Sequence, residues 1–410
     1  MIGSPQELHR KLRRWYSRNR RDLPWRVPVG SHADTLPDAY FVLVSEGMLQ
    51  QTQVATVVPY FKRFIKAFPT IRHLAHADEQ AVLRLWQGLG YYSRARNLRG
   101  AARMVLEEFG GIIPRDIVSL RRLPGVGRYT AGAIASLAFG RREPIVDGNI
   151  VRVICRLDCI ENDPRDRAVI DHIWSRAAEL LPTTRVAAFN SSLMELGATI
   201  CTPKQPKCLL CRVRDLCGAL AAGKVQHIPP PRKSKPTPLN RRTVICALRQ
   251  HQKTIEVLIE QRPATGRWAG MWQFITVSSE VEITPPPCAQ GGGRGEGRAR
   301  KPAPRNEPSP RPPPGVPGGG DRALERQTGA LTDIRHIAQL QHQLTHRRYE
   351  FDVYAATVDC SMKPMKPIEK LAGNRRWVAL ANLSDYPLPR PHVLIAQALA
   401  EQVAHLPPFA

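Results

Sequence analysis

The sequence predicts a two-domain fold in which an all-α domain is followed by an α+β domain. In the first half, apolar and aromatic residues recur at helical spacing, and short Gly/Pro turns separate the segments. In the second half the periodicity is that of strands, and the stretch QHIPPPRKSKPTPLN between the halves is rich in proline and basic residues. We therefore expect an all-α domain over 1–225, a linker over 226–240 and an α+β domain over 241–410.

Charge and cysteine content restrict the class of partner. The chain of 410 residues carries 60 Lys and Arg against 35 Asp and Glu, a net charge of +25. This excess favours a polyanionic partner, nucleic acid before membrane. The sequence contains no apolar run long enough to cross a bilayer, so we expect no membrane partner. Nine cysteines, four of them close together, suit a reducing compartment better than a disulfide scaffold.

The start of the chain predicts a basic amphipathic helix, because Leu8, Leu12 and Trp15 share one helical face. An arginine-rich start is also typical of a transit peptide, but the acidic Glu7 and Asp22 favour the helix. The segment lacks the apolar core of a secretion signal. If the protein is bacterial, we expect it in the cytoplasm, associated with the nucleoid.

The segment FVLVSEGMLQQTQV at 41–54 predicts a helix with a buried face, although its apolar start also fits a strand. The apolar residues that step by three and four are Phe41, Val44 and Met48. On such a helix Glu46, Gln50 and Gln53 form a polar stripe. Glu46 is then either a solvated surface group or a carboxyl in a partly dry cleft, where the protonated form is favoured and suits a general acid.

The segment LPGVGRYTAGAIASLAFG at 123–140 predicts two helices joined by a tight hairpin. Pro124 ends the first helix, and Gly125 and Gly127 permit tight or left-handed backbone before the second. Backbone N–H groups beside a helix N-terminus suit one phosphate, while a plain interhelix turn is equally consistent. Further along, Asp147 is placed to cap the helix that follows it.

A cluster of four cysteines predicts a metal centre. Gaps of six, two and five residues separate Cys201, Cys208, Cys211 and Cys217. Four thiolates in one short segment can hold a zinc ion or an iron-sulfur cluster, and the spacing does not choose between them. Unrelated buried cysteines are the less favoured alternative, since chance rarely groups four so tightly.

The second half predicts strands over 243–248, 254–260 and 349–358 and a closing helix over 391–402. Its middle, about 285–320, is rich in Pro, Gly and Arg and almost free of aliphatic residues, so we expect a disordered insert there.

Together these motifs resemble the iron-sulfur members of the helix-hairpin-helix DNA glycosylases, and among them the adenine DNA glycosylases. The resemblance runs through nearly all of 7–226 and more loosely through 241–400. It is carried by the hairpin, by Asp147, by the cysteine spacing, and by LPWR at 23–26, SEGMLQQTQVATVVPYF at 45–61, GLGYYSRARNL at 88–98 and VDGNIVRV at 146–153. It implies a helix-hairpin-helix domain with an iron-sulfur loop at 201–217, followed by a nudix-like α+β domain.

The resemblance implies four catalytic positions. Glu46 matches the glutamate that protonates adenine and helps to activate water, and Asp147 matches the carboxylate that stabilises the oxocarbenium-like sugar, with Asn149 beside it. Tyr129 stands where lyase-competent relatives carry a lysine, and a phenol cannot form a Schiff base. We therefore expect base removal without efficient strand cleavage.

The resemblance also implies residues that contact DNA. Trp25, Arg26 and Glu195 match the adenine pocket, and Gln51 and Tyr91 match residues that wedge the helix open while the base is flipped. For these five, core packing or a solvated surface position is the alternative. The segment 27–39 is several residues longer than the family usually has after Arg26. The hairpin glycines, Gly125 and Gly127, belong to the expected phosphate contact.

The nudix-like domain is expected to bind and not to hydrolyse. RALERQTG at 322–329 stands where a nudix hydrolase carries its magnesium-binding glutamates, which are replaced by Ala323, Arg326 and Gln327. The expected 8-oxoguanine-reading loop lies in HQLTH at 342–346. Its residues are Leu344, Thr345 and His346, which match the family's Phe-Ser-His.

The expected protein is a monomeric, monofunctional adenine DNA glycosylase. It acts on double-stranded DNA with adenine opposite 8-oxoguanine or guanine and carries a 4Fe-4S cluster. Three alternatives remain: a thymine or uracil mismatch glycosylase of the same superfamily, an inactive iron-sulfur DNA-binding protein, and a nudix pyrophosphohydrolase. The nudix-like second domain disfavours the mismatch glycosylase. The presence of both Glu46 and Asp147 disfavours the inactive DNA-binding protein. The altered segment 322–329 disfavours the pyrophosphohydrolase.

Overall fold

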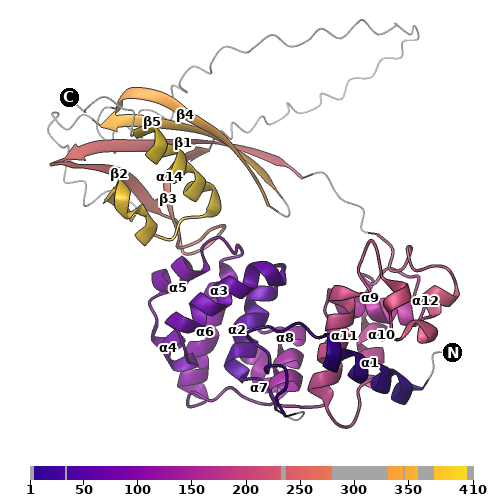
Figure 1. The fold of residues 1–410 in the computed structure, drawn as a ribbon. Helices are drawn as coiled ribbons and strands as arrows, with labels where there is room; N and C mark the ends of the chain where they lie inside the picture. The colour runs from indigo at the N-terminus through magenta and orange to yellow at the C-terminus, as the bar shows by residue number, and fades with distance from the viewer. Residues whose placement is uncertain are drawn as a thin grey trace, which may run out of the picture. The chain divides into compact units, whose positions relative to one another are not determined.

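The computed structural model describes residues 4–32, 35–231, 237–278, 331–344, 347–358 and 374–403 (Figure 1). It divides into two compact units, one of Met1–Pro236 with Pro263–Met271 and one of Thr237–Arg262 with Trp272–Ala410. The first unit is helical and the second is built on a sheet, which confirms the predicted fold class. The expected insert at about 285–320 lies outside the described residues.

The helical unit consists of short helices in two groups, seen side by side in Figure 1. One group holds α2 (Ala39–Leu49), α3 (Val54–Ala67), α4 (Ile71–His76), α5 (Glu79–Trp86), α6 (Ser93–Glu108), α7 (Ile117–Arg122) and α8 (Arg128–Ala133), the last running into a π-helical turn, η1 (Ile134–Ala138). The other holds α1 (Pro5–Asn19), α9 (Gly148–Leu157), α10 (Arg167–Glu179), α11 (Val186–Thr199) and α12 (Gly218–Ala221), with two 3₁₀ turns, η2 (Cys208–Leu210) and η3 (Arg214–Leu216). Among the helices in the described part of the chain, none is long and apolar enough to cross a membrane.

The helix starts follow from side-chain capping. A serine, threonine or aspartate accepts a hydrogen bond from the first turn and so satisfies an orphan N–H group. The residues that do so are Ser4, Asp38, Thr70, Asp78, Asp116 and Asp147. In α1, Leu8, Leu12 and Trp15 are buried along one face, so the predicted amphipathic helix is confirmed.

The helix expected over 41–54 is shorter and more deeply buried than predicted. α2 ends at Leu49, and the next helix begins at Val54 with Gln53 as its N-cap. The expected polar stripe of Glu46, Gln50 and Gln53 on one helix is therefore wrong. The chain leaves the helix at Gln50, whose ψ of 112° is not helical, and Gln51 then adopts a left-handed conformation with φ 57°. Side chains all around α2 are buried, so Glu46 lies inside the unit.

The second unit is a six-stranded mixed sheet in the order β4-β5-β1-β3-β2-β6. Its strands are β1 (Leu239–His251), β2 (Thr254–Gln261), β3 (Trp272–Ser278), β4 (Leu331–Gln343), β5 (Arg348–Val358) and β6 (Arg375–Ala379). β1 runs parallel to β5, and the other pairs are antiparallel. The predicted strands over 243–248, 254–260 and 349–358 are confirmed, whereas the sequence pattern did not reveal β3, β4 and β6.

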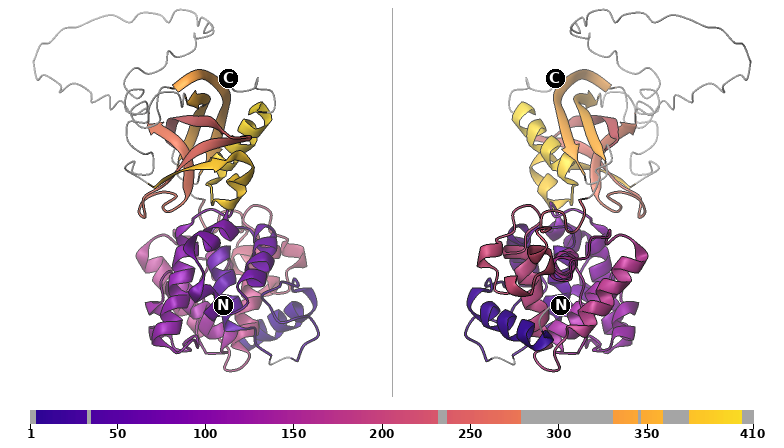
Figure 2. Two further views of the ribbon diagram at one scale, coloured as in Figure 1. Left: turned by 90° about the vertical axis from the view of Figure 1, so that its left-hand side faces the viewer. Right: turned by 90° about the vertical axis from the view of Figure 1, so that its right-hand side faces the viewer.

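A helix covers one face of this sheet. After a 3₁₀ turn, η5 (Leu380–Asp385), comes α14 (Arg390–Val403), which confirms the predicted closing helix and lies along the sheet in both views of Figure 2. Its buried His392 packs on the rings of Phe274 and Phe351 at 5.9 and 6.0 Å. Phe274 lies on β3 and Phe351 on β5, and α14 also contacts β4.

The predicted linker over 226–240 is structured at both ends. Ile228 is buried in the helical core, and its carbonyl accepts a hydrogen bond of 2.8 Å from Nε of Arg156. β1 begins at Leu239. Apolar burial at one end and strand pairing at the other therefore shorten the segment that joins the two units.

Candidate active site

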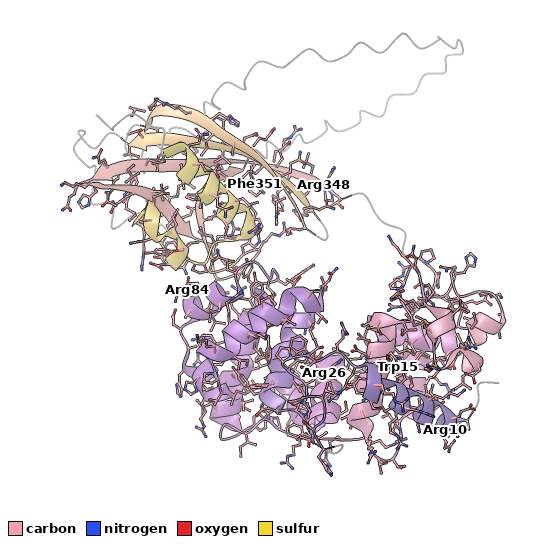
Figure 3. The ribbon with its side chains drawn as sticks, in the orientation of Figure 1. Arg10, Trp15, Arg26, Arg84, Arg348 and Phe351 are labelled. Carbon is pink, nitrogen blue, oxygen red and sulfur yellow. The ribbon has the colours of Figure 1, made fainter. Side chains whose placement is uncertain are left out.

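The candidate active site is a cavity of about 1320 Å³ in the helical unit. Its walls come from α1, the segment that follows Trp25, α2 and the loop after it, the start of α8, Asp147–Asn149 and α11. Figure 3 shows Arg26 between the two groups of helices. Sites for drug-sized ligands measure roughly 300–1,000 Å³, so this cavity has room for more than one base. Seven predicted residues line it: Trp25, Arg26, Glu46, Gln51, Tyr129, Asp147 and Asn149.

Glu46 faces this cavity from α2 and is only 6 % exposed. Burial raises the pKa of its carboxyl to about 7, because a low-dielectric surrounding disfavours the anion. The nearby charge of Asp147 acts in the same direction, whereas the hydroxyl of Tyr129 and the charge of Arg26 oppose it. Glu46 can therefore hold a proton near neutral pH and also release it, as a general acid must.

Asp147 is a partly buried carboxylate whose two oxygens are both fixed. It caps α9 by accepting from the N–H of Ile150 at 2.7 Å, and its other oxygen accepts from Nδ2 of Asn149 at 2.8 Å. Burial raises the pKa of Asp147, and these hydrogen bonds counter that effect by favouring the anion. Asp147 is thus both a helix cap and an oriented negative group at the cavity wall.

Tyr129, on α8, lies near the carboxyl groups of Glu46 and Asp147. Its hydroxyl donates a hydrogen bond to Sδ of Met194 at 3.8 Å. Burial, together with the charges of Glu46 and Asp147, raises the pKa of its phenol well above the usual value. Tyr129 therefore stays protonated at neutral pH and is a hydrogen-bond donor.

Glu195 is fully buried in α11 and forms ion pairs with Arg21 and Arg26. Nε of Arg21 lies 2.6 Å from one of its oxygens and Nη2 of Arg26 lies 2.9 Å from the other. Burial alone would raise the pKa of Glu195, but both arginines outweigh it and hold that pKa below its usual range. Trp25 is buried and packs edge-on against Phe61. Arg21 was not among the predicted residues, and the basic run at 18–21 gave no sign of which arginine turns inward.

The predicted wedge residues lie on two loops. Gln51 follows α2 and Tyr91 precedes α6, and both side chains are exposed. Both have left-handed backbone, with φ 57° and 48°.

The hairpin between α7 and α8 presents its glycines to solvent. Gly125 has φ 76°, and a Cβ there would lie 2.7 Å from Cβ of Asn97, so only glycine fits. Gly127 is extended, with φ −84°, and not left-handed. It is the N-cap of α8 and leaves the helix N-terminus open for a phosphate.

Two arginines of α9 connect the active site with the cysteine loop. Nη2 of Arg152 donates to Oδ1 of Asn149 at 2.9 Å, and its Nε donates to the carbonyl of Cys201 at 2.7 Å. Hydrogen bonds thus run without a break from Asp147 to the first cysteine. Nη1 of Arg156, which is 1 % exposed, donates to Sγ of Cys201 at 3.3 Å. The signal that could have revealed them is two arginines four residues apart in the otherwise apolar VRVICRL.

The four cysteines of the loop converge. Burial raises the pKa of the Cys211 thiol to about 11, and the charges of the other three add to the effect. Nevertheless, no three His, Cys, Asp or Glu side chains in the described part of the chain are placed to hold a single metal ion. Four thiols in one loop are a donor set that suits either a zinc ion or an iron-sulfur cluster.

The expected reading loop is described only in part. Leu344 follows β4, and its N–H donates to the carbonyl of Arg347 at 2.8 Å. Thr345 and His346 lie outside the described residues, as does the segment 322–329.

Two protein-family models match separate parts of the chain. Residues 44–179 match the HhH-GPD superfamily of base excision DNA repair proteins, and residues 244–398 match the NUDIX domain. Among solved structures, a thermostable thymine-DNA glycosylase is 29 % identical with a TM-score of 0.47, covering 53 % of this chain and 97 % of that one. An endonuclease III–DNA complex is 22 % identical with a TM-score of 0.43, covering 54 % of this chain and 98 % of that one.

Curated relatives cover more of the chain. The adenine DNA glycosylase of Rattus norvegicus is 40 % identical over 319 residues, which are 68 % of this chain and 62 % of that protein. The human enzyme is 36 % identical over 408 residues, 89 % of this chain and 68 % of that protein. The mouse enzyme is 35 % identical over 406 residues, 89 % of this chain and 72 % of that protein. The chain belongs to the adenine DNA glycosylase family.

Proposed function

We propose that this protein is a monofunctional glycosylase that removes adenine mispaired with 8-oxoguanine or guanine from double-stranded DNA. The observation that carries the proposal is the carboxyl group of Glu46, whose pKa is raised to about 7 beside the oriented carboxylate of Asp147. Hydrolysis of an N-glycosidic bond needs an acid for the leaving base and a negative group for the cationic sugar. The two carboxyl groups fill these roles in one cavity.

The reaction assigns one task to each group. Glu46 donates its proton to a ring nitrogen of adenine. The N-glycosidic bond then breaks, and the electron pair of this bond leaves with the base. Asp147 stabilises the positive charge on the sugar, held in place by Asn149. Glu46, now a carboxylate, accepts a proton from the water that attacks the sugar. Glu46 is thereby protonated again, and the products are free adenine and an abasic site.

A panel of duplexes tests this proposal. Each holds A, T or U opposite G or 8-oxoguanine, and product is measured with and without alkali. We expect release of adenine alone, fastest opposite 8-oxoguanine, with strand breaks that need alkali. Release of thymine or uracil would favour the mismatch glycosylase, and no release from any duplex would favour a DNA-binding protein without activity.

Cys201, Cys208, Cys211 and Cys217 are proposed to hold a 4Fe-4S cluster with a structural role. When bound, such a cluster fixes the loop that carries Lys207, Arg212 and Arg214, which are exposed and suit phosphate contacts. We expect protein purified without oxygen to be yellow-brown and to contain iron and sulfide. Stoichiometric zinc without iron would contradict the cluster.

The second unit is proposed to read the base opposite adenine. Adenine in a normal pair is chemically the same leaving group, so the information that a pair is wrong must come from its partner. 8-Oxoguanine carries a proton on N7 that guanine lacks, and the hydroxyl of Thr345 is an acceptor suited to it. Losing such a hydrogen bond costs about 0.5–1.5 kcal/mol, up to roughly tenfold in preference.

We expect Thr345→Val combined with His346→Ala to narrow the preference for adenine opposite 8-oxoguanine over adenine opposite guanine by up to about tenfold. Single-turnover rates on both duplexes measure this ratio. Thr332→Val, on exposed β4 of the same sheet, is the matched control. If the double variant discriminates as well as the control, the reading of the lesion lies elsewhere in the chain.

A further inference from the structure

Arg94 is a buried arginine whose guanidinium bonds to two loops at once. It lies near the start of α6 and is 8 % exposed. Nη1 donates to carbonyls at the end of α2, and Nη2 donates mainly to the loop before α6. The acceptors are the carbonyls of Gly47, Met48 and Gln50 for Nη1, and Oγ1 of Thr52 and the carbonyls of Leu89 and Gly90 for Nη2.

Two of these bonds lie directly before strained residues. The carbonyls of Gln50 and Gly90 belong to the peptide groups that precede Gln51 and Tyr91, and both of these residues have left-handed backbone. For residues other than glycine this conformation is strained and persists only where the surrounding structure enforces it. Arg94 supplies that enforcement on both loops through one rigid group.

The charge and shape of Arg94 suit this task. The last carbonyls of α2 have no partner within the helix, and the helix dipole favours a cation there. The guanidinium also lies over the rings of Trp86 and Tyr91, at 5.6 and 5.4 Å from their centres. Burial lowers the pKa of Arg94 to about 10, so the group keeps its charge at neutral pH. Lysine carries a point charge on one nitrogen and cannot span both loops in this way.

We infer that Arg94 is a positioning residue that joins the loop of Gln51 to the loop of Tyr91, so that both side chains enter the DNA helix as one unit. The inference rests on the proposed function, in which these residues wedge the duplex open. Base flipping requires that the space left by the base be filled while its pair is broken. If the two loops moved independently, the side chains of Gln51 and Tyr91 would fill this space together less often than when their spacing is fixed.

The test compares targets that do and do not need wedging. The variant is Arg94→Lys, and single-turnover excision is measured on adenine opposite 8-oxoguanine and on adenine in a one-base bulge, which has no pair to break. We expect the rate on the paired target to fall at least about tenfold, the worth of one or two hydrogen bonds. On the bulged target we expect a loss of less than about threefold, because an unpaired base is cheaper to flip. Fluorescence of 2-aminopurine next to the target should show the matching loss of flipping.

Arg99→Met is the control. Arg99 lies on the same helix, donates to the carbonyl of Ala77 at 2.7 Å and pairs with Glu79, away from both loops. The Arg99→Met variant should keep the wild-type ratio between the excision rates on the paired and the bulged target. An equal loss on both targets in Arg94→Lys would overturn the inference, because Arg94 would then only support the fold. No excision by the wild-type enzyme on either target would overturn the proposed function instead, and the inference with it.

A second measurement covers the case in which Arg94→Lys is unstable. If Arg94 acts through the wedge, removing Gln51 and Tyr91 side chains by alanine substitution should leave little further effect of Arg94→Lys on the paired target. Full additivity of the losses would contradict the inference. Melting temperatures of all variants, measured by circular dichroism, identify losses that come from unfolding.

Discussion

Glu46→Gln is expected to lower the rate of adenine excision by about 10² to 10⁴-fold, the usual contribution of a general acid. Glutamine has nearly the same shape but cannot donate a proton to the leaving base. Binding of the substrate duplex should stay close to that of the wild type, since Glu46 is buried in α2. Single-turnover excision and gel-shift titration measure the two effects. A rate within about threefold of the wild type would end the role of Glu46 as the acid.

The stability of Glu46→Gln at different pH values shows whether the substitution damages the fold. The pKa of Glu46 is raised from 4.5 to about 7 in the folded protein, so the folded state binds more protons than the unfolded state between these values. Stability therefore falls as pH rises through this window, by about 3 kcal/mol for a difference of 7 − 4.5. Glu46→Gln removes this loss and should unfold at a higher temperature than the wild type at pH 8, with a smaller difference at pH 5. A lower melting temperature at pH 8 would mean that lost activity reflects damage to the fold.

Tyr129→Lys is expected to convert a protein that gives almost no covalent adduct into one that is trapped on DNA by borohydride. The wild-type residue is a protonated phenol beside Glu46 and Asp147, and it offers no amine for an imine with the opened sugar. A lysine at this position would place an amine beside the same two carboxyl groups. Gel mobility of the reduced protein–DNA complex measures the adduct.

Tyr129→Phe serves as the control for this substitution, because it removes the hydroxyl without adding an amine. It should give as little adduct as the wild type. Abundant trapping in both the wild type and Tyr129→Phe would assign the imine to another lysine and would contradict a monofunctional reaction.

Local sequence signals predicted the parts of the protein that local physics determines. Capping and helical spacing depend on short segments, and they correctly predicted α1, the cap of α9 at Asp147 and α14. The strands β3, β4 and β6 were missed because their neighbours in the sheet, and not their own pattern, specify them. Likewise, the apolar periodicity predicted that the helix continues past Leu49, whereas the non-helical backbone of Gln50 ends it there.

In the candidate active site, too, the residues in local motifs could be predicted, and those that depend on long-range contacts could not. Glu46, Asp147 and Tyr129 lie in contiguous motifs, and the structure brings all three to one cavity. The arginines that hold the site together lie far from their partners in the chain. Arg94 contacts a carbonyl 47 residues before it, and Arg21 contacts a glutamate 174 residues after it. No sequence pattern within one segment reports such pairs, so they appear only in the folded chain.

The ion pairs of Glu195 with two arginines affect the release of free adenine after the reaction. Arg21 and Arg26, which line the cavity, are both paired with this buried glutamate. An uncharged purine that has been cut free therefore has no ion pair to break on its way out. We expect free adenine to be a weak product inhibitor, and slow turnover, where it occurs, to reflect the DNA that stays behind.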